Sequence, residues 1–173
     1  MKNFLKWTGI VLGGLLGLIL IAALGLYIFG PDPVTIRSEV QIAAAPDVVF
    51  DQFTTYDYWD ELWDVIDVTP PQGPEAGSRF QFVEPDGTVI NGVITRYEEG
   101  HIYAADLAME GIDAQFAFSL TLEPTANGTR AVLYNEGNVG GLMKVMMAAY
   151  AMTGEMDAYY DLVINRLKTK VEG

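Results

Sequence analysis

The stretch from Trp7 to Phe29, WTGIVLGGLLGLILIAALGLYIF, contains no charged residue. A helix over it would be about 35 Å long, slightly more than the hydrocarbon core of a bilayer, which is roughly 30 Å thick. A cleavable signal peptide has a shorter apolar stretch followed by small residues, whereas here Tyr27, Ile28 and Phe29 precede the sequence GPDP. We therefore predict an uncleaved transmembrane anchor over residues 7–29.

The charges around this segment predict its orientation. Lys2 and Lys6 precede it, and the first basic residue after it is Arg37. Because positive charge favours the cytoplasmic side, residues 1–6 are predicted to be cytoplasmic and the C-terminal domain extracytoplasmic. The chain would then be a single-pass protein of the cell membrane, facing the periplasm in a Gram-negative source. Residues 30–33, GPDP, form a stiff linker because each proline fixes its own φ.

Gly9, Gly13 and Gly17 follow one another at four-residue spacing within the predicted anchor. Small residues at this spacing let two membrane helices approach closely. Self-association or a helix partner is therefore one interpretation, and the ordinary glycine content of membrane helices is the other.

Charge and composition exclude several functions for the remainder of the chain. The first 30 residues hold two lysines and no acid, so the formal net charge of −13 becomes −15 beyond them. Such an acidic domain is a poor partner for nucleic acid. The chain has no cysteine, which excludes disulfides, thiolate metal sites and thiol catalysis. No cofactor is expected.

The remaining sequence has an α+β pattern. Residues 34–42 alternate strictly between apolar and polar, as in a half-buried strand, and Pro46 suits the first turn of a short helix. Trp59, Leu62, Trp63 and Ile66 recur at helical spacing. After a loop at 69–77, strands follow with hairpin turns at EPDGTV, EEGH and ANGT. One long helix is predicted from Gly141 to about Val171.

The order of these elements resembles the SRPBCC superfamily, in particular the polyketide cyclase/dehydrase-like branch of the START and birch-pollen-allergen fold. The resemblance covers about residues 34–171. It rests on the sequences VTIRSEVQIAAAPDVVFDQF, YWDELW, GSRFQF and FAFSLTLEPTANGTRAVLYNEG. It implies a helix-grip domain over residues 34–173, in which an antiparallel sheet curls around the last helix and encloses a cavity.

The strand alternation then predicts which side chains line this cavity. Five of the seven methionines lie in the predicted last helix, and flexible thioethers conform to varied apolar ligands, although they also fill irregular cores. Leu107 and Leu133 share the inner face of the sheet. The candidate ligand-binding residues are Trp59, Trp63, Phe80, Phe82, Tyr103, Met109, Phe116, Phe118, Asn135, Met143, Met146, Met147 and Tyr150.

The segment YDYWDELW combines four aromatic rings with three carboxylates. Core packing or the lip of the pocket accounts for its tryptophans, and a solvated face accounts for Asp57, Asp60 and Glu61. An acidic active site would need two carboxylates of distinct environment facing one cleft. No calcium-loop pattern is present, and His101 is the only histidine; we expect no metal site.

Three functions agree with these patterns. The leading one is a membrane-anchored module that binds a small hydrophobic ligand, lipid-like or isoprenoid-like, in the cavity. The second is an accessory or scaffold subunit of a membrane protein complex. The third is a polyketide cyclase/dehydrase-like enzyme, in which Tyr103, Asn135 and Arg96 would polarise the substrate.

Overall fold

The computed structural model describes residues 2–31 and 33–173, with side chains from residue 12 onward. Lys2, Lys6, Trp7 and Gly9 therefore have no described side chain, and Asp32 of the predicted linker lies outside the described residues. The elements are α1 (Lys2–Phe29), β1 (Val34–Ile42), α2 (Pro46–Phe53), η1 (Tyr56–Tyr58), α3 (Trp59–Trp63), β2 (Asp67–Thr69), β3 (Arg79–Val83), β4 (Val89–Glu98), β5 (Ile102–Met109), β6 (Ala114–Thr125), β7 (Gly128–Val139), α4 (Gly141–Ala151) and α5 (Glu155–Glu172).

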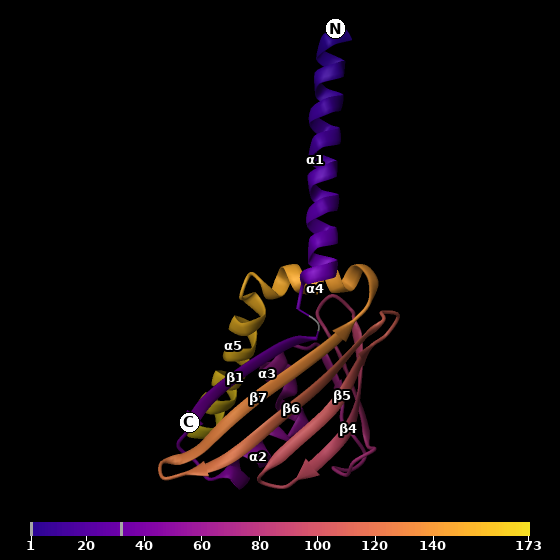
Figure 1. Cartoon of the computed structure of the whole chain (residues 1–173). Helices are drawn as coiled ribbons and strands as arrows, with labels where there is room; N and C mark the ends of the chain where they lie inside the picture. The colour runs from indigo at the N-terminus through magenta and orange to yellow at the C-terminus, as the bar shows by residue number, and fades with distance from the viewer. Residues whose placement is uncertain (1, 32) are drawn as a thin grey trace.

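The N-terminal helix α1 stands away from the rest of the chain, and α4 crosses its foot (Figure 1). Its segment Leu12–Phe29 has a mean hydropathy of 2.4, and none of that segment is buried. This helix is long and apolar enough to cross a membrane, and a signal sequence near an N-terminus would have the same properties. A Cβ atom added at Gly13 or Gly17 would meet nothing within 4 Å apart from its chain neighbours and the backbone of its own helix. A partner helix at these glycines stays a prediction.

The seven strands form one antiparallel sheet in the order β1-β7-β6-β5-β4-β3-β2. The three predicted hairpin turns join β3 to β4, β4 to β5 and β6 to β7. The sheet curls, and α5 runs beside β1 (Figure 1). This is the predicted α+β helix-grip arrangement. The first strand, β1, pairs with the last strand, β7, and the strands between them in the sequence follow in reverse chain order.

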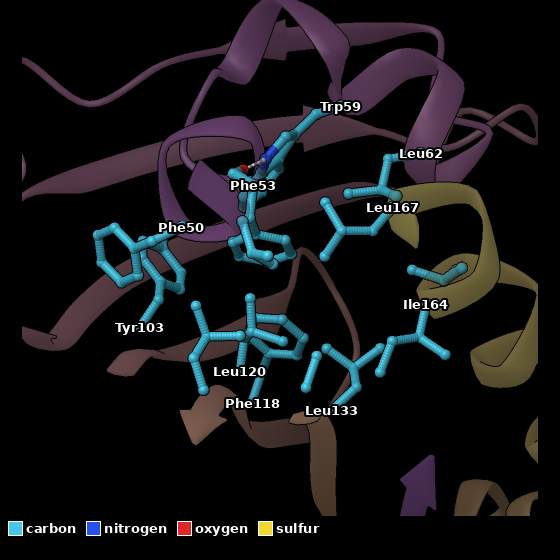
Figure 2. Close-up of a cluster of buried hydrophobic side chains, with 14 of the residues drawn as sticks. Phe50, Phe53, Trp59, Leu62, Tyr103, Phe118, Leu120, Leu133, Ile164 and Leu167 are labelled. Atoms are coloured by element: carbon cyan, nitrogen blue, oxygen red, sulfur yellow. Dashed lines mark hydrogen bonds between the residues drawn. The ribbon is translucent and has the colours of Figure 1, made fainter. Parts of the chain in front are cut away.

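Alternation along the strands decides which side chains enter the core. On β1, Val34, Ile36, Ser38 and Ile42 are buried, whereas the polar residues that alternate with them are exposed. This face packs against α5, and burying its apolar side chains stabilises the fold. Figure 2 shows the centre of the core, where side chains from α2, α3, the sheet and α5 meet: Phe50, Phe53, Trp59, Leu62, Tyr103, Phe118, Leu120, Leu133, Ile164 and Leu167.

The predicted last helix is two helices, which corrects the expectation of one continuous helix. Residue Gly154 separates α4 from α5 and has a φ of 74°, a left-handed conformation. Glycine adopts it without the steric cost of a Cβ atom, so the chain can turn here. Of the two helices, only α5 contributes to the hydrophobic core, with Tyr160, Val163, Ile164 and Leu167.

The aromatic helix after Tyr58 is also shorter than predicted. It ends at Trp63 because Asp64 takes a left-handed conformation with a φ of 55°. Ile66 was expected on the buried stripe, but it lies beyond this break and is 66% exposed. Asp57, Asp60 and Glu61 are exposed as expected, while Tyr58, Trp59 and Leu62 are buried.

Candidate functional site

A cavity of about 380 Å³ lies between the sheet and the helices α3, α4 and α5. A volume of this size is within the usual range for small-molecule sites, roughly 300 to 1,000 Å³. Its lining is mostly aromatic and aliphatic, with methionines supplied by β5, α4 and α5. The lining residues are Trp59, Trp63, Val65, Phe80, Phe82, Glu84, Asp86, Thr88, Ile90, Leu107, Met109, Ile112, Phe116, Phe118, Asn135, Met143, Met147, Tyr150, Met156, Tyr159 and Tyr160.

Two glycines in the sheet position the phenylalanines of the cavity wall. Phe80 on β3 pairs with Gly92 on β4, and Phe116 on β6 pairs with Gly137 on β7. A Cβ atom at Gly92 would come within 2.1 Å of the Phe80 ring, and one at Gly137 within 2.8 Å of the Phe116 ring. The rings therefore lie over the glycine backbone, a close approach that a larger residue would prevent.

Helix α4 covers one part of the cavity with residues spaced three and four positions apart. Met143, Met147 and Tyr150 lie on one face of α4 at this spacing, and all three line the cavity. Each is partly exposed. Long flexible thioethers suit a wall that contacts apolar molecules of varied shape.

Two buried polar atoms in the cavity wall have no hydrogen-bond partner among the described residues. They are Oδ1 of Asn135 and Nε1 of Trp63. Asn135 is 7% exposed, and its amide nitrogen donates to the hydroxyl of Tyr160. Trp63 packs edge-on against Phe118 and Tyr160, with ring centroids 5.4 and 6.0 Å apart.

These contacts place the side chains of Asn135 and Trp63 in the same part of the cavity wall. Phe118 is the cross-strand neighbour of Asn135, and Tyr160 contacts both Asn135 and Trp63. One atom is an acceptor and the other is a donor. A buried polar group without a partner costs free energy, so this part of the wall favours a molecule that can both donate and accept.

The tyrosines around the cavity act as hydrogen-bonding groups. Burial raises the pKa of Tyr160 to about 12, and the hydrogen bond from the Asn135 amide acts in the opposite direction. Burial likewise raises the pKa of Tyr159, whose hydroxyl donates to the carbonyl of Trp63 at 2.7 Å. Both phenols stay protonated at neutral pH and hold neighbouring groups in place.

Two carboxylates lie at the rim, in the turn between β3 and β4. Burial raises the pKa of Glu84, and the neighbouring Asp86 raises it further. The backbone and hydroxyl of Thr88 lower the pKa of Asp86 by hydrogen bonding. The turn therefore places a carboxyl group with a raised pKa beside one with a lowered pKa, next to the otherwise apolar wall.

Most of the predicted ligand-binding residues line the cavity, although contact with a ligand stays a prediction for all of them. Those lining it are Trp59, Trp63, Phe80, Phe82, Met109, Phe116, Phe118, Asn135, Met143, Met147 and Tyr150. Trp59 has a second role, because its indole nitrogen donates to the Phe53 carbonyl at 2.7 Å inside the core (Figure 2).

Tyr103 and Met146 do not line the cavity, contrary to expectation. Tyr103 has the predicted strand parity, but Phe53 packs against its ring and Tyr56 bonds its hydroxyl at 2.9 Å, so it is fully buried in the core. Met146 lies on another face of α4 and is 56% exposed. Leu133, also expected on the wall, is buried in the core.

The structure does not bring together the three residues expected of a cyclase-like enzyme. A register shift between Ile94 and Arg96 changes the parity of β4. Tyr97 then packs on Phe50, with ring centroids 5.0 Å apart, and Arg96 pairs outside the core with Glu98 at 2.7 Å. With Tyr103 in the core, only Asn135 of the three lines the cavity.

Several lining residues were not predicted as part of the site. Ile90 shares the parity of the sheet wall and could have been found by alternation. Glu84, Asp86, Thr88 and Ile112 lie in turns, where side-chain direction follows no sequence period. Met156 and Tyr159 could not be placed because the break at Gly154 rotates α5 relative to α4.

Comparison with known proteins agrees with this geometry. The sequence model of the family described as polyketide cyclase/dehydrase and lipid transport matches residues 33–172. No curated protein matches the chain.

Among solved structures, protein MLL2253 from Mesorhizobium loti is 17% identical with a TM-score of 0.65, over 80% of this chain and 97% of that one. TTHA0849 from Thermus thermophilus is 14% identical with a TM-score of 0.61, over 80% and 97%.

The di-domain ARO/CYC protein StfQ from the steffimycin biosynthetic pathway is 15% identical with a TM-score of 0.64. The match covers 80% of this chain and 51% of StfQ, so the chain corresponds to about half of that protein. At these identities the likeness concerns the fold. The sheet and the last helix have the SRPBCC-like fold of these neighbours. The family match spans most of the chain, which belongs to the polyketide cyclase/dehydrase and lipid transport family.

Proposed function

We propose that this protein is a membrane-anchored module that binds a small, mostly apolar molecule in the cavity between the sheet and the helices α3, α4 and α5. The cavity itself is the observation that carries the proposal. Its volume of about 380 Å³ suits a small ligand. An apolar molecule that leaves water for such a wall gains the hydrophobic free energy of its buried surface.

The ligand is of a lipid-like or isoprenoid-like class with one polar group. Aromatic and methionine side chains form most of the wall, which supports an extended or branched hydrocarbon body. The unpaired atoms of Asn135 and Trp63 support a polar group that accepts from the indole and donates to the amide oxygen. A hydroxyl group does both.

The membrane part of the proposal rests on α1. Its uncharged segment is long enough to span the hydrocarbon core, and the positive-inside rule applied to Lys2 and Lys6 orients the cavity domain to the extracytoplasmic side. A periplasmic or outer-surface reporter fused after Gly173 tests this orientation. Activity of a cytoplasm-only reporter at the same position would refute it.

Ligand binding is tested by filling the cavity. The full-length chain is purified in mild detergent, and its bound small molecules are identified by mass spectrometry. Met147→Trp places an indole in the cavity, whereas Met146→Trp places the same group on the exposed face of α4 and serves as the matched control. We expect the wild-type chain and Met146→Trp to retain the molecule and Met147→Trp to lose it.

Two results would contradict ligand binding. Equal retention by all three chains would place the molecule outside the cavity. Absence of any bound molecule in the wild-type chain, together with failure to take up a fluorescent long-chain alcohol, would remove the binding proposal.

A further inference from the structure

The 11-residue helix α4 presents an apolar face that the described part of the domain does not cover. Leu142 is 75% exposed, Met146 is 56% exposed, and Met152 directly after the helix is 75% exposed. Lys144 is the one charged residue of α4. Away from α4, the exposed large apolar residues of the domain each lie on a different segment: Val48 on α2, Ile66 in the turn before β2, Ile112 in the turn before β6 and Leu162 on α5. A concentrated apolar patch of this kind marks a surface that contacts another protein or a membrane.

Helical spacing gives α4 two different apolar faces. Met143, Met147 and Tyr150 face the cavity, while Leu142, Met146 and Ala149 form the neighbouring face at the same spacing of four and three. All three of the latter are exposed. The helix therefore separates the apolar contents of the cavity from whatever covers its outer face.

Helix α4 packs against the C-terminal end of α1. Ala148 on α4 is fully buried, and a Cβ atom added at Gly30 would come within 2.8 Å of the Ala148 Cβ. The ammonium of Lys144 lies 5.5 Å from the centre of the Tyr27 ring, at the end of α1. Figure 1 shows α4 crossing the foot of α1, on the side of the domain from which α1 leaves.

We propose that the outer face of α4 lies in the interface of the bilayer that α1 enters. This inference rests on the proposed function, because it takes α1 to span the membrane. Tyr27 then lies at the level where aromatic residues gather in membranes, and Lys144 beside it extends its ammonium towards the headgroups. Apolar side chains of α4 enter the boundary between headgroups and acyl chains, as in helices that lie flat on membranes.

A consequence for the site is that the membrane itself supports one wall of the cavity. Met143 and Met147 border the cavity on one side of α4, and Leu142 and Met146 border the lipid on another. An apolar ligand then passes between bilayer and cavity around a single short helix, without crossing bulk water. The partner is a lipid surface, and the domain's net charge of −15 favours a zwitterionic one.

The experiment uses the absence of cysteine from the chain. Met146→Cys on α4 and Val48→Cys on α2 each carry an NBD fluorophore, in the full-length chain reconstituted into phosphatidylcholine vesicles. Val48 is 50% exposed, and α2 lies at the end of the domain away from α1 (Figure 1). We expect NBD at position 146 to emit further to the blue and to be quenched several-fold more by nitroxide-labelled lipid than NBD at position 48.

The outcomes separate this inference from the anchor. Vesicles are first floated at alkaline pH; a chain that does not float with them would refute the anchor itself. A chain that floats but shows equal quenching at both positions would overturn the placement of α4 in the bilayer interface, while the membrane anchor would still stand. Emission at position 146 that shifts with protein density, without quenching by lipid, would assign the face to a second copy of the chain and also overturn the inference.

Discussion

The concave face of the sheet has a solid half and a hollow half, and the same strands run through both. Along β6, Leu120 and Leu122 are fully buried and Phe118 is 4% exposed, whereas Phe116 further along the same face is only half-buried at the cavity. The solid half is covered by α2 and α5 with phenylalanine and branched aliphatic residues. Helix α4 covers part of the hollow half with methionines.

The difference shows that alternation in a strand selects a face without determining whether that face is filled. Protein interiors are packed to nearly crystalline density where rigid side chains interlock. The solid half reaches this state because Phe50 and Phe53 enter it from a helix whose apolar face is fully buried. The hollow half also receives side chains from helices, Trp59 and Trp63 from α3 and methionines from α4, but they leave a cavity of about 380 Å³ between them and the sheet.

The largest expected effect comes from creating space in the solid half. Phe53→Ala removes a side chain that is 1% exposed and contacts the rings of Trp59, Tyr103 and Phe118. We expect the free energy of unfolding to fall by about 3 to 5 kcal/mol, as for other buried phenylalanines. Urea denaturation followed by tryptophan fluorescence measures it. Met147→Ala is the counterpart in the hollow half; an equally large loss there would contradict the distinction.

A smaller effect is expected at the polar part of the cavity wall. Asn135→Leu leaves the buried Tyr160 hydroxyl without its hydrogen-bond partner, which costs about 1 to 3 kcal/mol of unfolding free energy. Adding Tyr160→Phe removes the orphaned hydroxyl and should restore most of the loss. The same denaturation measurement applies. Failure of the double variant to recover would show that shape, and not the hydrogen bond, decides the stability of this region.

Replacing a side chain by a larger one also distinguishes the two halves, because the hollow half has room for it and the solid half does not. Met147→Trp directs an indole into existing space, so we expect a loss of less than about 1.5 kcal/mol. Leu120→Trp forces the same group into a site that is fully buried, where overpacking costs about 1 to 3 kcal/mol or more. Thermal unfolding of the two variants side by side gives the comparison. Equal destabilisation would mean that the cavity closes in solution.

The smallest expected effect is the pH dependence of Glu84 at the rim. Burial and Asp86 raise its pKa above the ordinary 4.5, so its contribution to stability is present below pH 4.5 and lost as pH rises through the raised pKa. Glu84→Gln should therefore increase the free energy of unfolding at pH 7, and the difference should vanish below about pH 4. Because water reaches half of the side chain, we expect about 0.5 kcal/mol or less. A greater gain at pH 4 than at pH 7 would contradict the raised pKa.

The fold could be predicted from the sequence because its strands carry a clear period of two and its turns contain glycine at the right places. The surroundings of a side chain could not be predicted where another segment packs against it or where the strand register changes. Parity predicts Tyr103 at the cavity, but Phe53 and Tyr56 from another segment enclose it. The irregularity before Arg96 leaves no compositional trace and reverses the parity that follows.

The helical part of the site shows a second limit. In α4 nearly every residue is apolar, so spacing alone cannot tell which methionines turn inward. Met147 lines the cavity, whereas its neighbour Met146 does not. The rotation of α4 is set by its contact with Gly30 and by the turn at Gly154, both of which depend on tertiary structure.

The outer edges of the sheet bear on the proposed membrane anchor, which would confine the protein to a plane. An unpaired strand edge can pair with a second chain, and tethering to a surface would bring identical edges together often. Here α5 runs along β1, where Lys168 donates to the Gln41 carbonyl and Glu172 accepts from the Ala43 amide, both at 2.8 Å. At the other edge, β2 has only three residues. Neighbouring copies crowded on one surface would thus find little backbone through which to join into aggregates.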